Sequence, residues 1–225
     1  MTDAGGKTCA RPGYVLGLTG SIGSGKTTAA GFFRDAGVPV WNADEAVSAI
    51  YAGNRDAVRG VAQILPDAVS DGVIDRDRLR QGIIEEPSRL AAVETLIHPL
   101  VSADRAAFVG DAGKQGAPLV VCEIPLLFET GAEADCDGIL VMTTSPAERR
   151  RRVLSRPGMT DAVLDRLLAR QIADDLRLER ADFVIESRSR EAVREEVRAL
   201  IALLTNDDRT VKIGGAGRAI AGQGG

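Results

Sequence analysis

The chain has 225 residues, of which 44% are hydrophobic, and its formal net charge at pH 7 is −4. This length and apolar content suffice for one substantial α/β core with an inserted subdomain, and the acidic balance indicates neither a nucleic acid nor an anionic membrane as partner. Three widely spaced cysteines exclude a disulfide scaffold. Because the sequence has no apolar signal core and no run near the ~20 residues that span a bilayer, we expect a soluble protein of the reducing cytoplasm.

The beginning of the chain predicts a phosphate-binding loop. Residues 1–13 are small and polar and predict a flexible tail. An apolar strand is predicted at 15–19 and a helix at 27–36, and the loop between them fits the pattern G-x-x-x-x-G-K-[ST]. Strand, glycine loop and helix in this order aim backbone N–H groups and the positive helix end at a phosphate.

We therefore expect ATP to bind at this loop, with the Lys26 ammonium at the β- and γ-phosphates and the Thr27 hydroxyl on Mg²⁺. The expected ATP-binding residues of the loop are Gly20, Ser21, Ile22, Gly23, Ser24, Gly25, Lys26, Thr27 and Thr28.

The second predicted strand, 38–41, carries a carboxylate to the same sheet edge. It is followed by Asn42, Ala43 and Asp44, and the carboxyl ends of parallel strands share the edge where ligands bind. Asp44 could accept the proton of an attacking hydroxyl or help to hold Mg²⁺. Alternatively, Asp44 could be the N-cap of a helix that starts at Glu45.

A helical insertion is predicted after this strand. Helical patterns at 45–51, 55–65 and 88–110 fill an interval too long for a simple connection, and we expect a helical substrate domain at 47–111. His98, the only histidine, lies in an apolar helical stretch and is expected to be a hydrogen-bonded packing residue. A lone histidine supports neither a metal site nor a catalytic triad.

The third predicted strand, 119–124, places Glu123 where phosphate-loop proteins often have a Mg²⁺-binding acid. Because Pro125 follows closely, we expect contact through water, and a simple strand-end carboxylate is the alternative. Further strands are predicted at 139–143 and 183–185. Alternating strands and helices predict a doubly wound parallel α/β sheet, with a core at 14–46, 112–148 and 179–205.

Residues 149–178 are rich in arginine and predict a helical lid. Arg152, Arg156, Arg166, Arg170 and Arg177 include spacings of four, and Pro157-Gly158 would break the helix into a hairpin. Arginines in such a lid stabilise the charge that develops on a transferred phosphoryl group. The alternative is a solvated helix face. Residues 206–225 are expected to form a second flexible tail.

Taken together, these segments resemble the dephospho-CoA kinase family. The segments that carry the resemblance are Gly17–Thr28, Asn42–Asp44, Asp71–Leu79, Ile97–Leu100, Ile124–Glu129, the lid with Arg152, Arg156, Gln171 and Arg177, and Ala181–Ile185. The resemblance covers residues 14–203 and implies a P-loop kinase with a helical CoA-binding domain and a lid.

The family resemblance also implies an activity and site residues. ATP would phosphorylate the ribose 3′-hydroxyl of dephospho-CoA in the last step of coenzyme A synthesis, with Asp44 as the proposed base. Lys26, Arg152 and Arg156 would serve the transferring phosphoryl group, and Arg177 would bind ATP. The acceptor pocket would include His98, Pro125, Leu126 and Leu127. The chain could be a monomer or a homo-oligomer.

Three positions depart from the family pattern. Asn42 stands where the family usually has Asp, Arg149 where it often has Gln, and Glu186-Ser187 where it favours Asp-Asn. The alternative functions are another small-molecule P-loop kinase, of nucleotide or shikimate type, and a nucleotide switch. The long insertion argues against the first, and the absence of an N-K-x-D sequence argues against a GTPase switch.

Overall fold

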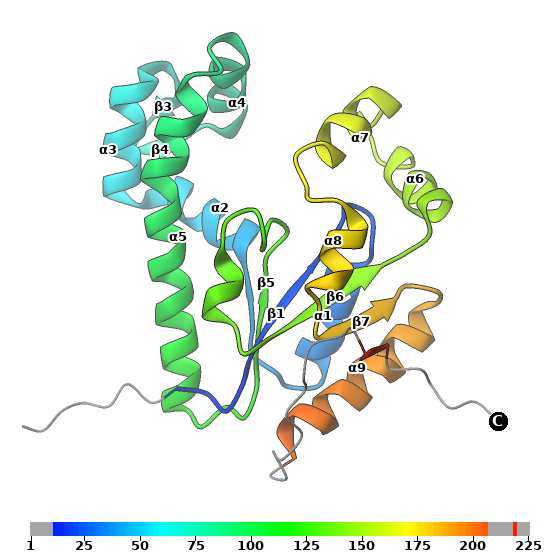
Figure 1. The fold of residues 1–225 in the computed structure, drawn as a ribbon. Coiled ribbons are helices and arrows are strands. Elements are labelled where there is room, and N and C mark those ends of the chain that lie inside the picture. The colour runs from blue at the N-terminus through cyan, green and yellow to red at the C-terminus, as the bar shows by residue number, and fades with distance from the viewer. Residues whose placement is uncertain (1–10, 207–217, 220–225) are drawn as a thin grey trace, which may run out of the picture. The chain divides into compact units, whose positions relative to one another are not determined.

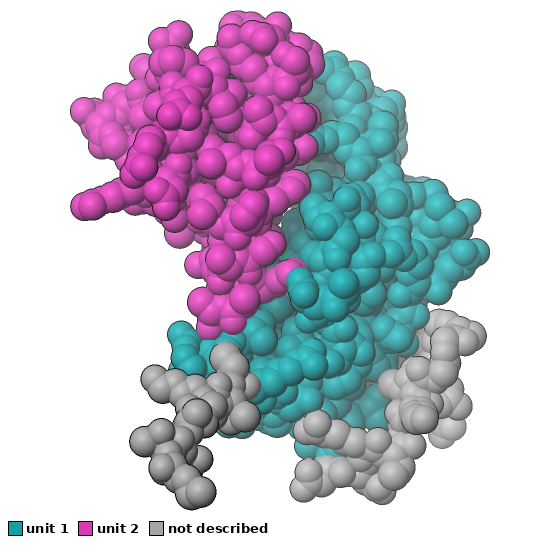
Figure 2. All heavy atoms as spheres, turned by 60° about the vertical axis from the view of Figure 1, so that its left-hand side comes forward, with its two compact units in different colours: residues 1–41, 109–225 teal, residues 42–108 magenta. Residues whose placement is uncertain are grey.

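The computed structural model describes residues 11–206 and 218–219. The chain divides into two compact units, residues 1–41 with 109–225 and residues 42–108 (Figure 2). Most of both predicted tails lies outside the described residues. At the end of the first predicted tail, the Gly13 N–H donates to the Ala117 carbonyl at 3.1 Å and Arg11 pairs with Asp137 at 2.8 Å. Residues 11–13 are therefore bound to the rest of the first unit.

The first unit is built on a sheet with the strand order β2-β5-β1-β6-β7-β8 (Figure 1). β1 pairs in parallel with β5 and β6, β6 with β7, and β7 with β8. The strands are β1 Val15–Gly20, β2 Val40–Asn42, β5 Val120–Glu123, β6 Gly138–Thr143, β7 Phe183–Glu186 and β8 Arg218–Ala219. Because β1 lies between β5 and β6, the loop that follows it leaves from the middle of the sheet.

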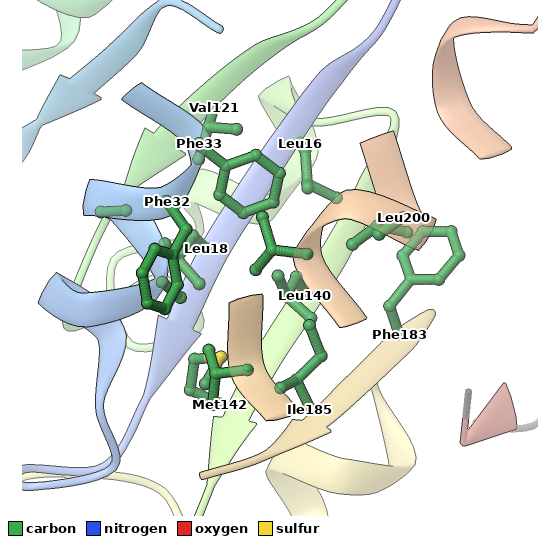
Figure 3. Close-up of a cluster of buried hydrophobic side chains, with 14 of the residues drawn as sticks. Leu16, Leu18, Phe32, Phe33, Val121, Leu140, Met142, Phe183, Ile185 and Leu200 are labelled. Carbon is green, nitrogen blue, oxygen red and sulfur yellow. The ribbon is translucent and has the colours of Figure 1, made fainter. Parts of the chain in front are cut away.

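Two helices cover the central strands with apolar side chains. α1 (Lys26–Asp35) and α9 (Arg190–Thr205) share one hydrophobic cluster with the strands. Figure 3 shows Phe33 of α1 and Leu200 of α9 in one cluster with Leu16 of β1 and Leu140 of β6. Residue by residue, β1 is buried throughout, which explains its continuous apolar sequence.

The second unit has its own hydrophobic cluster. Its elements are α2 Ala43–Gly53, α3 Arg55–Ile64, the 3₁₀ helix η1 Pro66–Ala68, the hairpin strands β3 Val69–Ser70 and β4 Val73–Ile74, α4 Arg76–Glu85, and most of α5 Arg89–Lys114. Fully buried Val61 on α3 and Ile97 on α5 belong to that cluster. The hairpin and α4 were not predicted as separate elements. β3 and β4 have only two residues each, too few to show an alternation of apolar and polar residues.

The arginine-rich region forms three helices in place of a simple hairpin. They are α6 Pro146–Leu154, α7 Asp161–Leu168 and the short α8 Asp174–Glu179. A 3₁₀ helix outside this region, η2 Ala132–Asp135, lies between β5 and β6. Arg150 on α6 pairs with Asp161 on α7 at 2.6 Å. Gly158, with a φ of 75°, lies in the turn between α6 and α7, as the Pro-Gly break predicts. Of the helices in the described part of the chain, none is both long and apolar enough to cross a bilayer.

Candidate functional site

The loop between β1 and α1 has a backbone that glycine makes possible. Gly20 and Gly25 have φ values of 147° and 97°, in the region that side chains with a Cβ rarely adopt. A Cβ on Gly20 would lie 2.3 Å from the Met142 carbonyl oxygen on β6. Gly25 is the N-cap of α1, so the loop ends where the positive end of that helix begins. Loop and helix together form a phosphate-binding cradle.

Lys26 lies against this loop. Its Nζ donates to the carbonyl oxygens of Gly20 at 2.7 Å and Ser21 at 3.1 Å. Two carbonyls hold the ammonium over the loop, where the flexible stem can deliver a point charge to a phosphate. The geometry suits the predicted role of Lys26.

Thr27 and Glu123 bring two oxygen donors together. The Thr27 Oγ1 donates to the Glu123 Oε1 at 3.3 Å, and Glu123 is only 3% exposed. A hydroxyl and a carboxylate are the hard oxygen ligands that Mg²⁺ takes, and the remaining ligands are usually water and phosphate. In the described residues, no three His, Cys, Asp or Glu side chains gather into a larger metal cluster. The Thr27 hydroxyl and the Glu123 carboxylate are ligands that fit a Mg²⁺ ion shared with a nucleotide.

Asp44 is not the cap of its helix. α2 begins at Ala43, and the N-cap is Asn42, whose Oδ1 accepts from the Glu45 N–H at 3.0 Å. The capping alternative for Asp44 is wrong. At this capping position Asn serves as well as the Asp that is usual in the family. The Asp44 side chain lies on the first turn of α2 in the second unit.

Arg152 is fixed beside the phosphate-binding loop. Its Nη1 donates to the Ser187 Oγ at 2.9 Å, its Nη2 to the Ser187 carbonyl at 3.0 Å and its Nε to Glu148 at 2.6 Å. A Cβ on Gly25 would lie 3.8 Å from the Nη1. Arg152 forms an i,i+4 ion pair with Glu148, and Arg151 shares the same carboxylate. These two arginines, Arg151 first, lower the pKa of Glu148 to about 2.

The other arginines do not share one face. Arg156, Arg166 and Arg170 are exposed, whereas Arg177 is 2% exposed. Arg177 donates to Asp174 at 2.5 Å and to the Ile172 carbonyl at 3.1 Å, and lies 3.9 Å from Glu129. The spacing of four predicted one shared helix face for these arginines. That prediction is wrong, because Arg177 lies on a separate helix, α8. Binding of ATP by Arg177 and a catalytic role of Arg156 stay predictions.

Two features of this network were not expected from the sequence. Buried Arg149 pairs with Asp174, so one carboxylate serves two arginines. The Gln171 Oε1 accepts from the Ile22 N–H of the phosphate-binding loop at 3.3 Å. The family pattern had pointed to Gln171 without a role, and no local sequence signal indicates Asp174.

The expected acceptor residues lie in both units. His98 is exposed on α5 and is not a packing residue, contrary to expectation. Pro125 and Leu126 are half-buried, and the Pro125 carbonyl accepts from the Thr19 hydroxyl at 3.3 Å. Leu127 is buried, and a Cβ on Gly17 of β1 would touch it at 3.3 Å. Their contact with an acceptor stays a prediction.

A parallel sheet with a glycine loop, a lysine and a Thr–carboxylate pair at the end of its central strand defines a P-loop phosphotransferase. The family model for dephospho-CoA kinase matches residues 14–192. The chain belongs to the dephospho-CoA kinase family.

Individual relatives agree with this assignment. The dephospho-CoA kinase of Jannaschia sp. (strain CCS1) is 47% identical over 192 residues, which are 85% of this chain and 97% of that protein. The enzyme of Cereibacter sphaeroides is 46% identical over 189 residues, 84% of this chain and 94% of its own. A crystal structure of a Thermus thermophilus protein superposes with a TM-score of 0.73 at 32% identity, covering 87% of this chain and all of that one.

Proposed function

We infer that this chain transfers the γ-phosphoryl group of ATP to the ribose 3′-hydroxyl of dephospho-CoA, giving coenzyme A and ADP. The observation that carries the inference is family membership over residues 14–192 together with an intact phosphate-binding loop. The chain is a kinase that uses ATP with Mg²⁺. We assign it to the last step of coenzyme A synthesis and to the cytoplasm.

The geometry supports a division of roles around the phosphates. The loop N–H groups and the start of α1 bind the phosphate chain, and the Lys26 ammonium neutralises charge that builds on the β- and γ-oxygens. Thr27 and Glu123 would hold Mg²⁺, which supplies further charge neutralisation on the phosphates. Arg152 and Arg156 would stabilise the transferring group from the lid.

The acceptor side is proposed to lie on the second unit. Asp44 would accept the proton of the 3′-hydroxyl as that oxygen attacks phosphorus, since its carboxylate is not engaged in capping. His98 of that unit, with Pro125, Leu126 and Leu127, would contact dephospho-CoA. The second unit as a whole would be the acceptor domain, and residues 149–178 would be the lid that excludes water.

One acceptor experiment tests this function. The purified protein is incubated with Mg²⁺·ATP and dephospho-CoA, and the product is read by phosphorus NMR and mass. We expect a new 3′-phosphomonoester. The matched control is the 3′-deoxyribose analogue, which should stay unmodified. Turnover of AMP or shikimate, with none of dephospho-CoA, would contradict the proposal and favour another small-molecule kinase.

A further inference from the structure

The contact between Gln171 and the phosphate-binding loop is the starting point. The Gln171 side chain accepts from the Ile22 N–H at 3.3 Å. An amide N–H can only donate, so the carboxamide oxygen and not its nitrogen faces the loop. Gln171 lies 149 residues further along the chain, between α7 and α8. A neutral acceptor from the arginine-rich region therefore fixes the direction of one N–H at the tip of the loop.

The backbone next to Gln171 is held by two charged side chains, the half-buried Glu129 and the buried Arg177. The Ile172 N–H donates to the Glu129 Oε1 at 2.8 Å, and the Ile172 carbonyl accepts from Arg177 at 3.1 Å. Both backbone polar groups of the next residue, Ile172, are thus bound to charged side chains. Hydrogen bonds to charged groups are about twice as strong as neutral ones. Residue 171 has little freedom to move away from the loop.

Asp174 connects this segment to α6. One carboxylate oxygen accepts from Arg177 at 2.5 Å, and the other accepts from Arg149. α6 also lies against the loop: the Arg152 Nη1 donates to the Gly23 carbonyl at 3.4 Å, and a Cβ on Gly23 would lie 3.3 Å from the Arg149 carbonyl oxygen. The loop tip is therefore contacted on Ile22 by Gln171 and on Gly23 by α6. Asp174 links the segment that carries Gln171 to the helix that lies against Gly23.

We propose that Gln171 is a positioning residue for the nucleotide site, and that Asp174 sets it through its two arginines. The Gln171 oxygen holds the loop in its phosphate-binding shape before ATP arrives, so the loop does not have to be ordered on binding. Preorganisation of this kind raises affinity by reducing the ordering cost of the bound state. Arg177 acts in this arrangement through Ile172 and Asp174. The proposal rests on the proposed function only in requiring that the loop binds ATP.

Gln171→Met is the primary variant. Met has a similar length and packs in the same space, but its thioether is a poor acceptor. Loss of one hydrogen bond should weaken Mg²⁺·ADP and Mg²⁺·ATP binding by about 3- to 10-fold. Binding is measured by titration calorimetry without dephospho-CoA, so the result is independent of the acceptor. The melting temperature without nucleotide should change little.

Asp174→Asn tests whether Asp174 positions Gln171, and Asp175→Asn is its matched control. Asp175 is the next residue on α8 and is exposed. The one hydrogen bond that the structure shows for its side chain is accepted from the neighbouring Leu176 N–H. Asp174→Asn should weaken nucleotide binding by a similar factor, and Asp175→Asn should leave it unchanged.

The double variant decides between positioning and general damage. If Asp174 acts through Gln171, adding Asp174→Asn to Gln171→Met should weaken nucleotide binding no further, although it should still lower the melting temperature. Wild-type affinity in Gln171→Met would overturn the proposal. So would factors that multiply in the double variant. A wild-type protein that binds ATP but does not phosphorylate dephospho-CoA would instead contradict the proposed function alone.

Discussion

Lys26 is the residue on which the phosphate-binding prediction depends most directly. Its ammonium lies on the loop carbonyls and has a flexible stem. Lys26→Ala removes the point charge that stabilises the transferring group, so kcat should fall about 10²-fold or more. Steady-state kinetics with Mg²⁺·ATP measure the loss. Lys114→Ala is the control, because this exposed lysine at the end of α5 pairs with Asp111. Near-normal turnover in Lys26→Ala would exclude the phosphate role.

Asp44 can be tested cleanly because a neighbouring residue caps the helix. Asp44→Asn keeps size and hydrogen bonding but cannot take a proton, so the fold and ATP binding should persist while kcat falls roughly 10²–10⁴-fold. A single-turnover rate and a melting curve are measured on the same protein. Asn42→Ala should show the opposite pattern, since losing the cap costs about 1 kcal/mol of stability.

An unchanged rate in a stable Asp44→Asn variant would remove Asp44 from the chemistry. The ribose hydroxyl would then be oriented for attack without being deprotonated by this carboxylate.

At the scale of the elements, the central strands could be predicted because their signal is local. β1, β5 and β6 are short apolar runs, and a strand buried on both faces leaves that pattern in sequence. The loop after β1 was equally readable, since its glycines and lysine stand at fixed spacings. The alternative N-cap, Asp44, lies two residues after the true one, because Asn42 and Asp44 are both good capping residues and only the backbone distinguishes them.

The arginine-rich region could not be read in the same way. Arginines spaced by four suggest one helical face, but Arg177 is buried on α8 and Arg156 lies beyond the end of α6. Whether an arginine faces solvent depends on carboxylates distant in sequence. Glu129 precedes Arg177 by 48 residues and comes near it only through the fold. Such pairings leave no local pattern.

Arg152 gives the prediction that belongs to α6. Its guanidinium joins the helix to the end of β7 through two hydrogen bonds to Ser187, beside the phosphate-binding loop. Lysine cannot reproduce this planar arrangement, so Arg152→Lys should lower kcat/KM about 10- to 100-fold. Arg150→Lys is the matched control on the same helix, because Arg150 is exposed and pairs with Asp161. Wild-type kcat/KM in Arg152→Lys would mean that these hydrogen bonds do not serve the reaction.

The whole molecule has two hydrophobic clusters, one for each unit. Leu200 of α9 is fully buried in the cluster of the first unit, and Ile97 of α5 is 5% exposed in that of the second. The proposed division of phosphate binding and acceptor binding follows the boundary between these two units. Independent cores predict independent energetic effects.

Leu200→Ala and Ile97→Ala test this independence. Each removes buried methyl groups and leaves a cavity, so each should lower the free energy of unfolding by roughly 2–5 kcal/mol. Since the two residues belong to different clusters, the double variant should lose the sum of the two to within about 0.5 kcal/mol. Urea unfolding followed by far-UV circular dichroism measures all four proteins, and the buried Trp41 provides a fluorescence signal from the first unit. Ile97→Val replaces Ile97→Ala if the double variant does not fold. A departure from additivity of more than about 1 kcal/mol would mean that the two cores share their stability.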